Sequence, residues 1–491
     1  MLILYSLVIT LIIIKVVQQV IFQMKYQFPP GPKGLPFIGN VLQLSGPMRL
    51  MKNVDFAKTY GDMHTLTIFG RKQVVINSME VLQELKLEHC DDFNHRPVWI
   101  EALVNFSPGI VFKGIGKYEN NKKFVLKNLK KHGMGKSEME LKILNEIEDV
   151  MALIENSKPL NPLGFLETYS ANVICYLCFG KSWEYEKNDG NVYKHALKQM
   201  HKLSEILIKA DFLQFLKWIP SIKAKFQEYK KNVNILRDLG RHTLHEKQIR
   251  DGTSRLTLQS FDLSDDFLSD HNNSPSKAAI QNFEEIAQDM FTAGTLTTSA
   301  TLTFSIIQLI NKPLLQERLF VEIETNLGTR KEPTMSDIQH LPCMEGFIHE
   351  ILRVYPAVPF IPHATHNDTK LRSFHLPANT SVSINSCSIN NNPKVFQNPS
   401  EFDPSRWLDD DTKFKTSMKD SIITFGKGRR HCLGKSLARM EIFLMLVKLI
   451  RRYKLGIPIG SKMPSCTPLF GVAVFTPEEF VLQATIREQK V

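Results

Sequence analysis

The chain has 491 residues, of which 43% are hydrophobic and 23% are charged, and this composition excludes a disordered or fibrous protein. Its formal net charge of +11 points to a nucleic acid, an anionic membrane or an acidic protein as partner. No nucleic-acid-binding motif accompanies the charge, which leaves the last two. Seven scattered cysteines argue against a disulfide framework and for a reducing compartment.

The first 24 residues predict a membrane anchor. Residues 1–14 are apolar at all but three positions, and the apolar character resumes after Lys15 and lasts to Phe22. About 20 such residues can cross a bilayer as a helix. No small-residue cleavage site follows, and the segment lacks the arginines of a mitochondrial presequence. Because Lys15, Lys25 and Lys33 lie on the C-terminal side, we expect an uncleaved, single-pass endoplasmic-reticulum anchor with the rest of the chain in the cytosol.

Proline then dominates a short segment. Pro29, Pro30, Pro32 and Pro36 predict a stiff, non-helical connector over residues 25–40. No internal repeat and no long low-complexity linker follows, so residues 41–491 are expected to form one large domain. Early in that domain, two alternating runs around residues 70–72 predict a β-hairpin.

A short basic helix is predicted over residues 117–132. It carries Lys123, Lys127, Lys130 and Lys131 on one side. Such a run is either a solvated helix face or a docking surface for an acidic partner, and the residues alone leave both interpretations open.

A long helix is predicted from Lys277 to Asn311, where Lys312-Pro313 ends it. Its middle, residues 293–298, is dense in small and hydroxyl side chains. Threonine hydroxyls compete for the carbonyl four residues earlier and weaken the helix locally. Further on, Glu350 and Arg353 are spaced to share one face of another helix.

One cysteine, Cys432, lies in a glycine-rich segment just before a helical pattern that runs from Lys435 to about Tyr453. The backbone N–H groups and dipole of a helix start favour a thiolate. Arg429, Arg430 and Lys435 are expected to act in the same direction.

The glycines beside this cysteine argue for a function. A buried structural cysteine is the alternative interpretation, but it requires neither three flanking glycines nor a paired arginine. Gly428 and Gly434 either adopt a positive φ or let a bulky planar partner approach the backbone.

This segment resembles the haem-binding loop of the cytochrome P450 family, whose pattern is Phe-Gly-x-Gly-x-Arg-x-Cys-x-Gly. Residues 425–434 fill every fixed position of it. The resemblance implies that Cys432 is the axial thiolate ligand of the iron of haem b. It further implies that Arg430 pairs with a haem propionate, that Phe425 shields the sulfur, and that Gly428 and Gly434 lie against the cofactor.

The middle of the long helix resembles the family's Ala-Gly-x-Asp/Glu-Thr segment, which bends over the haem to admit dioxygen and water. Ala293 and Gly294 match its first two positions, and Thr297 matches the hydroxyl residue of proton delivery. Leu296 stands where the family has an acid, and leucine cannot relay a proton.

Further motifs follow in the family's order. The resemblance implies haem-propionate contacts by His363 and, in place of the family's Trp and Arg, by Tyr118 and Lys122. It also implies a substrate-contacting loop over residues 91–116. Outside the site, it implies a buried structural network, which consists of Glu350, Arg353 and Arg406.

The implied fold is the predominantly helical α+β architecture of cytochrome P450, preceded by the transmembrane anchor. The implied function is a microsomal haem-thiolate monooxygenase that inserts one oxygen atom of O2 into an apolar steroid, fatty acid or foreign compound. Electrons would come from NADPH through a separate flavoprotein, NADPH–cytochrome P450 reductase, with cytochrome b5 as a further candidate partner.

Two other functions stay open. The first is a haem-thiolate isomerase or dehydratase that acts on a peroxide without a reductase, which Leu296 favours. The second is a non-catalytic haem protein that binds a lipid or a gas. No nucleic acid is expected as a partner.

Overall fold

The computed structural model describes residues 25–488, except 37, 45–48, 88–90, 98–100, 135, 157–158, 184, 186–190, 213, 252–261, 331 and 471–473. The predicted anchor, residues 1–24, therefore lies outside the described residues. Within the described part, one helix, α11 (Lys277–Asn311), is long and apolar enough to cross a membrane. The most apolar stretch of α11 is 83% buried inside the protein, as in the core helix of a globular domain.

The chain forms two compact units. Unit 1 contains the chain up to Pro97 together with Phe360–Ile389 and Gly428–Arg430. Unit 2 contains Val98–Pro359, Asn390–Lys427 and the chain from His431 onward.

Unit 1 is built on a four-stranded sheet in the order β1-β2-β6-β3. Strand β1 (Met63–Ile68) pairs antiparallel with β2 (Arg71–Ile76), which confirms the predicted hairpin. The two-residue turn, Phe69 and Gly70, has the positive φ values of 47° and 80° that a tight hairpin requires. Strand β6 (Ser381–Asn385) runs parallel to β2 and antiparallel to β3 (Phe360–Ala364).

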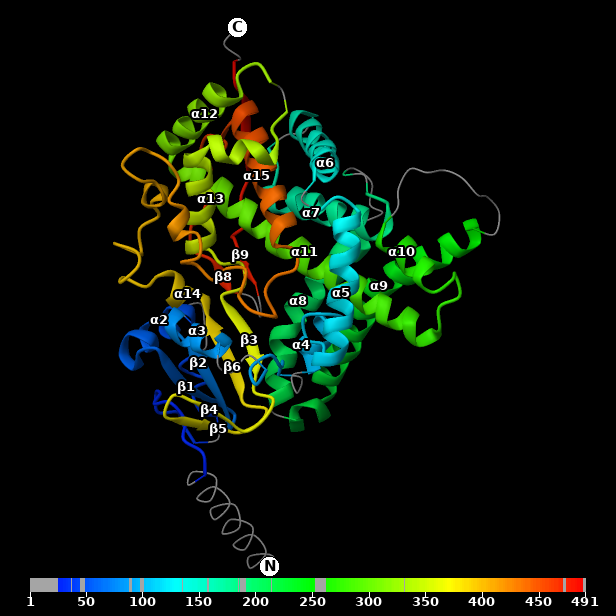
Figure 1. The fold of residues 1–491 in the computed structure, drawn as a ribbon, viewed down its shortest axis with the longest axis vertical. Coiled ribbons are helices and arrows are strands. Elements are labelled where there is room, and N and C mark those ends of the chain that lie inside the picture. Colours follow the sequence, from blue (N-terminus) through cyan, green and yellow to red (C-terminus); the bar gives the residue numbers. More distant parts are fainter. Residues whose placement is uncertain are drawn as a thin grey trace, which may run out of the picture. The chain divides into compact units, whose positions relative to one another are not determined.

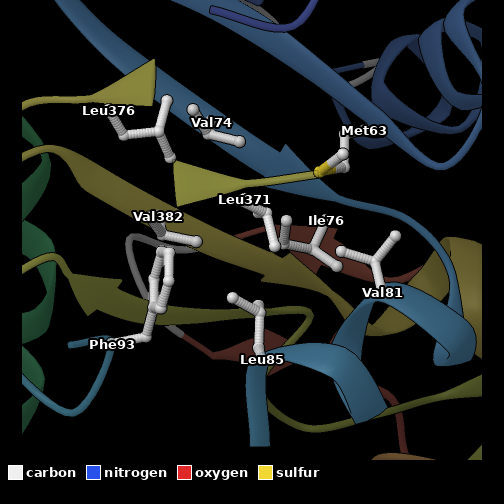
Figure 2. Close-up of a cluster of buried hydrophobic side chains, with 9 residues drawn as sticks. All are labelled: Met63, Val74, Ile76, Val81, Leu85, Phe93, Leu371, Leu376 and Val382. Carbon is white, nitrogen blue, oxygen red and sulfur yellow. The ribbon is translucent and has the colours of Figure 1, made fainter. Parts of the chain in front are cut away.

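The core of unit 1 lies where this sheet meets helix α3 (Met79–Leu87) and the small hairpin of β4 (Thr369–Leu371) and β5 (Phe374–Leu376). Figure 2 shows side chains from the sheet, the helix and the hairpin gathered in one cluster, with Phe93 at one side of it. The cluster consists of Met63, Val74, Ile76, Val81, Leu85, Phe93, Leu371, Leu376 and Val382. Helix α2 (Arg49–Tyr60) precedes the sheet.

The proline-rich segment is non-helical, as predicted, but it is docked on the sheet rather than spanning freely. The N–H of Thr65 in β1 donates to the carbonyl of Pro30 at 3.1 Å. The side chain of Asn40 accepts the N–H of Thr67 at 2.7 Å. Gly31 lies so close to the carbonyl of Thr65 that a β-carbon there would clash with it. The segment therefore belongs to unit 1.

Unit 2 is almost entirely helical, with two small antiparallel strand pairs. Figure 1 shows α11 with α7, α9 and α15 packed against it. The helices are α4 (Glu101–Phe106), α5 (Ile115–Lys131), α6 (Ser137–Asn156), α7 (Pro162–Phe179), α8 (Asn191–Phe212), α9 (Pro220–Asp251), α10 (Leu263–Asp270), α11, α12 (Pro313–Leu327), α13 (Pro342–Val354) and α15 (Lys435–Arg452). Short 3-10 turns are η2 (Gln214–Trp218), η3 (Met335–His340), η4 (Pro404–Trp407) and η5 (Thr416–Met418), and α14 (Ser386–Asn390) spans the boundary between the units. The strand pairs are β7 (Tyr453–Gly456) with β10 (Gln483–Ile486), and β8 (Leu469–Phe470) with β9 (Phe475–Thr476).

Helix α11 has the bounds that the sequence predicts. Ser276 caps its start, because the serine hydroxyl accepts the N–H of Ala279 at 3.2 Å. Five hydroxyls in its second half donate to the carbonyl four residues earlier, as the threonine-rich sequence suggests, yet the segment remains α-helical throughout. These hydroxyls belong to Thr297, Ser299, Thr301, Thr303 and Ser305.

The predicted buried network is assembled in unit 2. Glu350 on α13 accepts two hydrogen bonds from Arg353, both at 2.8 Å, and one from Nε of Arg406 at 3.0 Å. The indole N–H of Trp407 donates to the same carboxylate at 2.9 Å. Glu350 and Arg353 are fully buried, so this carboxylate is paired and hydrogen-bonded, as a buried charge must be.

Candidate functional site

The loop that carries Cys432 is shaped by its own backbone. The N–H of Cys432 donates to the carbonyl of Phe425 at 2.8 Å and closes the loop. Gly426 and Gly428 adopt φ values of 65° and 79°, which favour glycine. Gly434 has an ordinary φ of −85° and forms the N-terminal boundary of α15.

Two backbone donors and one charge act on the thiol. Hydrogen bonds from the N–H groups of Gly434 and Lys435, together with the Lys435 charge, lower the pKa of Cys432. Desolvation is larger and raises the pKa above the ordinary value. The two N–H donors and the Lys435 charge therefore favour the thiolate, but burial outweighs them, and the pKa of the Cys432 thiol is raised.

That Arg429 and Arg430 also act on the thiol stays a prediction, and the contacts that the structure gives for them lie elsewhere. Both belong to unit 1 and engage its segment 91–94. The guanidinium of Arg429 pairs with Asp91 at 2.8 Å, and Nε of Arg430 donates to the carbonyl of Asn94 at 3.0 Å. Of the three cations predicted to favour the thiolate, Lys435 has a charge that lowers the pKa of Cys432, although burial raises that pKa more.

The surroundings of Cys432 suit a planar group. The side chain of Cys432 is exposed, and desolvation is nevertheless the largest influence on the pKa of its thiol, which it raises. A β-carbon added to Gly434 would meet no atom within 4 Å. Of the two roles suggested for Gly434, its φ of −85° excludes the positive φ, and close approach of a partner stays a prediction.

Helix α11 exposes one face of its otherwise buried middle. Ala293 is exposed and Gly294 and Thr297 are half-buried, whereas their neighbours Thr295, Leu296 and Thr298 are buried. The hydroxyl of Thr297 donates to the carbonyl of Ala293 at 2.7 Å.

Gly294 has a second constraint. A β-carbon at this position would lie 2.5 Å from the side chain of Ile174 on α7. Its small size therefore allows α7 and α11 to pack closely, a role that the sequence did not reveal.

Unit 1 gathers a basic cluster around His363. Nδ1 of His363 is hydrogen-bonded to the carbonyl of Phe93 at 2.8 Å, and Arg96 donates to the carbonyl of Pro362. Burial, then the charges of Arg96 and Arg430, lower the pKa of His363 to about 3, so its imidazole is neutral at physiological pH. Guanidinium groups beside a neutral imidazole suit a carboxylate such as a propionate.

Arg96 was missed by sequence reasoning, because a single arginine before a proline matches no motif. Its burial, with 8% of its surface exposed, is visible only in the fold. On α5, the two residues that replace the family's Trp and Arg lie together: Tyr118 is buried, and Nζ of Lys122 is 5.7 Å from its ring centroid.

The segment from Asn105 to Lys113, predicted to contact substrate, is fastened to the first half of α11. Oδ2 of Asp289 accepts the N–H groups of Ile110 at 2.6 Å and of Val111 at 2.8 Å. Gln288 donates to the carbonyls of Asn105 and Phe106 at 2.8 and 3.1 Å.

Further contacts hold the same segment. Lys113 forms an ion pair with Glu285, and Gly109 packs so closely on the Glu285 carbonyl that a β-carbon would clash. Burial raises the pKa of Asp289 to about 7, against the lowering effect of the N–H groups, and its Oδ1 is buried without a hydrogen-bond partner. Glu285, Gln288 and Asp289, which hold this segment on α11, match no sequence motif, so the sequence did not predict their role.

The basic face of α5 is partly occupied. Lys127 pairs with Asp270 at 3.6 Å, and Lys131 pairs with Asp266, both on α10. Lys123 and Lys130 are exposed. The face available to a partner is therefore narrower than the sequence suggests.

The cysteines of the described residues belong to no cluster of ligands that could hold a metal ion. None of the six cysteines in the described residues forms a disulfide, and Cys175 and Cys178 are buried in α7 with raised pKa values. Within the described parts of both units, no group of three His, Cys, Asp or Glu side chains could hold a metal ion. One thiol beside an open glycine fits an iron whose other ligands come from a macrocycle.

Comparison with known proteins agrees with this fit. The family model described as cytochrome P450 matches residues 29–484. Cytochrome P450 2C25 of Mesocricetus auratus is 30% identical over 479 residues, which cover 93% of this chain and 94% of the relative. Cytochrome P450 2C50 of Mus musculus is 31% identical over 468 residues, covering 92% of this chain and 93% of the relative. Cytochrome P450 2C41 of Canis lupus familiaris is 30% identical over 465 residues, or 91% of each chain.

Proposed function

Because the chain belongs to the cytochrome P450 family and is a haem-thiolate monooxygenase, we propose that Cys432 is the axial ligand of its haem iron. One observation carries the proposal. Cys432 receives two backbone N–H donors at the start of α15, and the next glycine leaves its side-chain position open. The haem supplies, when bound, the iron at which O2 is reduced and one of its oxygen atoms enters the substrate.

Several side chains are proposed to hold the haem. Arg430, His363 and Arg96 would bind propionate oxygens, since they form a buried basic cluster in unit 1. Tyr118 and Lys122 would take the same role from α5. Phe425 would shield the sulfur, because its carbonyl already holds the N–H of Cys432.

We propose that Thr297 holds the water that delivers protons. Its hydroxyl lies on the exposed face of α11 and donates to the carbonyl of Ala293, so its oxygen remains free to accept a hydrogen bond from water. Leu296 is 8% exposed and can neither relay a proton nor hold a water. Proton delivery is therefore expected to run through hydroxyl and water alone.

The substrate is proposed to be an apolar molecule of the steroid, fatty acid or foreign-compound class. Phe106, Ile110 and Phe112 of the clamped segment are all buried apolar residues. Electrons are proposed to come from NADPH through a flavoprotein reductase that binds at Lys123 and Lys130, with cytochrome b5 as a further candidate. A single pass over residues 1–24 would hold the enzyme on the endoplasmic-reticulum membrane.

One observation favours a second candidate. The buried Leu296 removes the acid of the proton relay, and a haem-thiolate isomerase or dehydratase of peroxides needs no such relay. The two functions differ in their need for a reductant.

The experiment supplies purified holoenzyme either with NADPH and a reductase or with a fatty-acid hydroperoxide alone. Substrates for the first reaction are chosen by a binding difference-spectrum screen of sterols, fatty acids and drugs. Product that requires NADPH and O2 supports the proposal. Fast hydroperoxide conversion without any NADPH-dependent product would replace it with the second candidate.

A further inference from the structure

The first residue of α15 carries a positive charge beside the proposed iron ligand. We propose that Lys435 tunes the haem iron by holding electron density on the Cys432 sulfur, so that less is donated to the iron and the ferrous state is favoured. The inference rests on the proposed role of Cys432 as ligand. It concerns the ease of the first electron transfer, which the established activity leaves unspecified.

The geometry places Lys435 in contact with the loop by two routes. Its backbone N–H is one of the two donors to the Cys432 sulfur. Its Nζ lies 5.9 Å from the ring centroid of Phe425, within reach of a cation–π attraction. The carbonyl of Phe425 in turn accepts the N–H of Cys432 at 2.8 Å. The ammonium group is therefore held beside the loop.

The helix itself gives no reason for a lysine there. The N-terminus of a helix carries partial positive charge, so an acidic residue in the first turn stabilises it and a basic one does not. Helix α15 has no acidic residue in its first turn and begins with Lys435. The lysine opposes local helix stability, which favours a role in the electrostatics of the loop.

No carboxylate offsets this charge among the described residues. The nearby acid Glu345 already pairs with Arg439 at 3.1 Å and Lys419 at 3.6 Å. The pKa of His349 falls to about 3, mainly through burial, and Arg439, Lys419 and Lys435 all contribute to this lowering. His349 is thus neutral and adds no charge that would offset Lys435.

A fixed cation near a ligating thiolate has a predictable effect. It stabilises electron density on sulfur, so less is donated to the iron, and the reduction potential rises. Because Lys435 is exposed, water and salt screen its charge, and we expect a moderate effect that shrinks at high ionic strength. Electron transfer from a weak reductant becomes easier, while the electron donation that helps to cleave the O–O bond becomes smaller.

The test is a spectroelectrochemical titration of the substrate-free holoenzyme, with no reductase present. We expect Lys435→Glu to shift the ferric–ferrous equilibrium toward ferric by roughly three- to tenfold, where tenfold corresponds to about 59 mV for one electron. The neutral variant Lys435→Met should shift it about half as far, and Lys435→Arg should match the wild type. Raising the salt concentration should reduce these differences.

Lys462→Glu is the matched control. Lys462 is also exposed, and its charge is not among those that act on the Cys432 thiol, so the same charge reversal should leave the equilibrium unchanged. If Lys435→Glu and Lys435→Met stay within twofold of the wild type while their ferrous–carbon monoxide spectra show thiolate ligation, the tuning proposal is overturned. Equal shifts in Lys435→Glu and Lys462→Glu would also overturn it, because they would reflect net charge alone. Failure of the ligand assignment is separate, since Cys432→Ser would then retain the thiolate spectrum whatever Lys435 does.

Discussion

The carboxylate of Asp289 on α11 accepts the backbone N–H of Ile110 at 2.6 Å and fixes the segment proposed to contact substrate. The same oxygen also accepts the N–H of Val111. Replacing Asp289 with alanine would remove the carboxylate that accepts both N–H groups, and losing the partner of a buried N–H group costs about 1–3 kcal/mol. We predict that Asp289→Ala lowers the free energy of unfolding by at least that amount and weakens binding of apolar ligands in difference spectra. Asp289→Asn keeps an acceptor oxygen and should retain more of both, and equal losses in the two variants would contradict the clamp.

The pH dependence of the same residue can be predicted. Burial raises the pKa of Asp289 from 3.8 to about 7, so the native state holds its proton more tightly than the unfolded state does. Its contribution to stability is therefore fully present below pH 3.8 and is lost as the pH rises through about 7. Relative to Asp289→Asn, the wild type should become less stable between pH 5 and pH 8, as measured by urea unfolding. A constant difference between the two proteins would contradict the raised pKa.

Glu350 joins two arginines and an indole in the buried network of unit 2. Removing one partner of a buried charge network typically costs about 3–5 kcal/mol, because the remaining charges lose their compensation. We predict a loss of this size for Glu350→Gln in denaturant unfolding. The exposed pair of Arg372 and Glu84 is the control, since Glu84→Gln should cost under about 1 kcal/mol. Comparable losses of unfolding free energy in both variants would contradict the prediction that the buried network stabilises the fold more than an exposed ion pair does.

How far the sequence predicts this molecule depends on how local each feature is. The loop around Cys432 is contiguous, so its glycines, its cysteine and the start of the next helix are readable from ten residues. Helix α11 is similarly local, and it runs from Lys277 to Asn311 as predicted. The partners of the Arg429 and Arg430 side chains could not be predicted, because they lie in residues 91–94, more than 300 positions away in the sequence.

The contacts between α11 and the segment proposed to contact substrate could not be predicted from the sequence either. Asp289 and Gln288 look like polar positions on a helix, and only the packing of residues 105–111 against α11 gives them a role. Arg96 likewise acquires its role from His363 and Arg430, which lie far along the chain. Tertiary contacts of this kind leave no pattern in a single sequence.

The exposed lysines of α5 are predicted to set the rate of electron delivery. Charges at the rim of an interface mainly govern the association rate and its salt dependence. Lys123→Glu combined with Lys130→Glu should slow NADPH-driven reduction at low salt and leave substrate binding unchanged. Lys127 and Lys131 already pair with Asp270 and Asp266, so the same reversal there should slow reduction less per residue. Unchanged kinetics in the first variant would mean that this face is merely solvated.

The missing acid at position 296 should lower the efficiency of coupling. General acid–base groups typically contribute about 10²–10⁴-fold, so supplying one should be measurable. We predict that Leu296→Glu raises the amount of product per NADPH consumed and lowers hydrogen peroxide release, provided that its folded yield equals that of Leu296→Gln. Thr297→Ala should have the opposite effect, because it removes the exposed hydroxyl of α11. If Thr297→Ala left coupling unchanged, Thr297 would not be the proton-delivering residue.

The measurement that tests the central claim most directly is the absorption spectrum of the reduced protein with carbon monoxide, recorded for the wild type and for Cys432→Ser. Thiolate ligation gives a red-shifted Soret band, and serine cannot reproduce it. We predict that the wild type shows this band and that Cys432→Ser, purified with haem bound, does not, while Cys466→Ser, another partly exposed free cysteine of unit 2, keeps it. A red-shifted band that survives in Cys432→Ser would contradict the assignment and with it the proposed site.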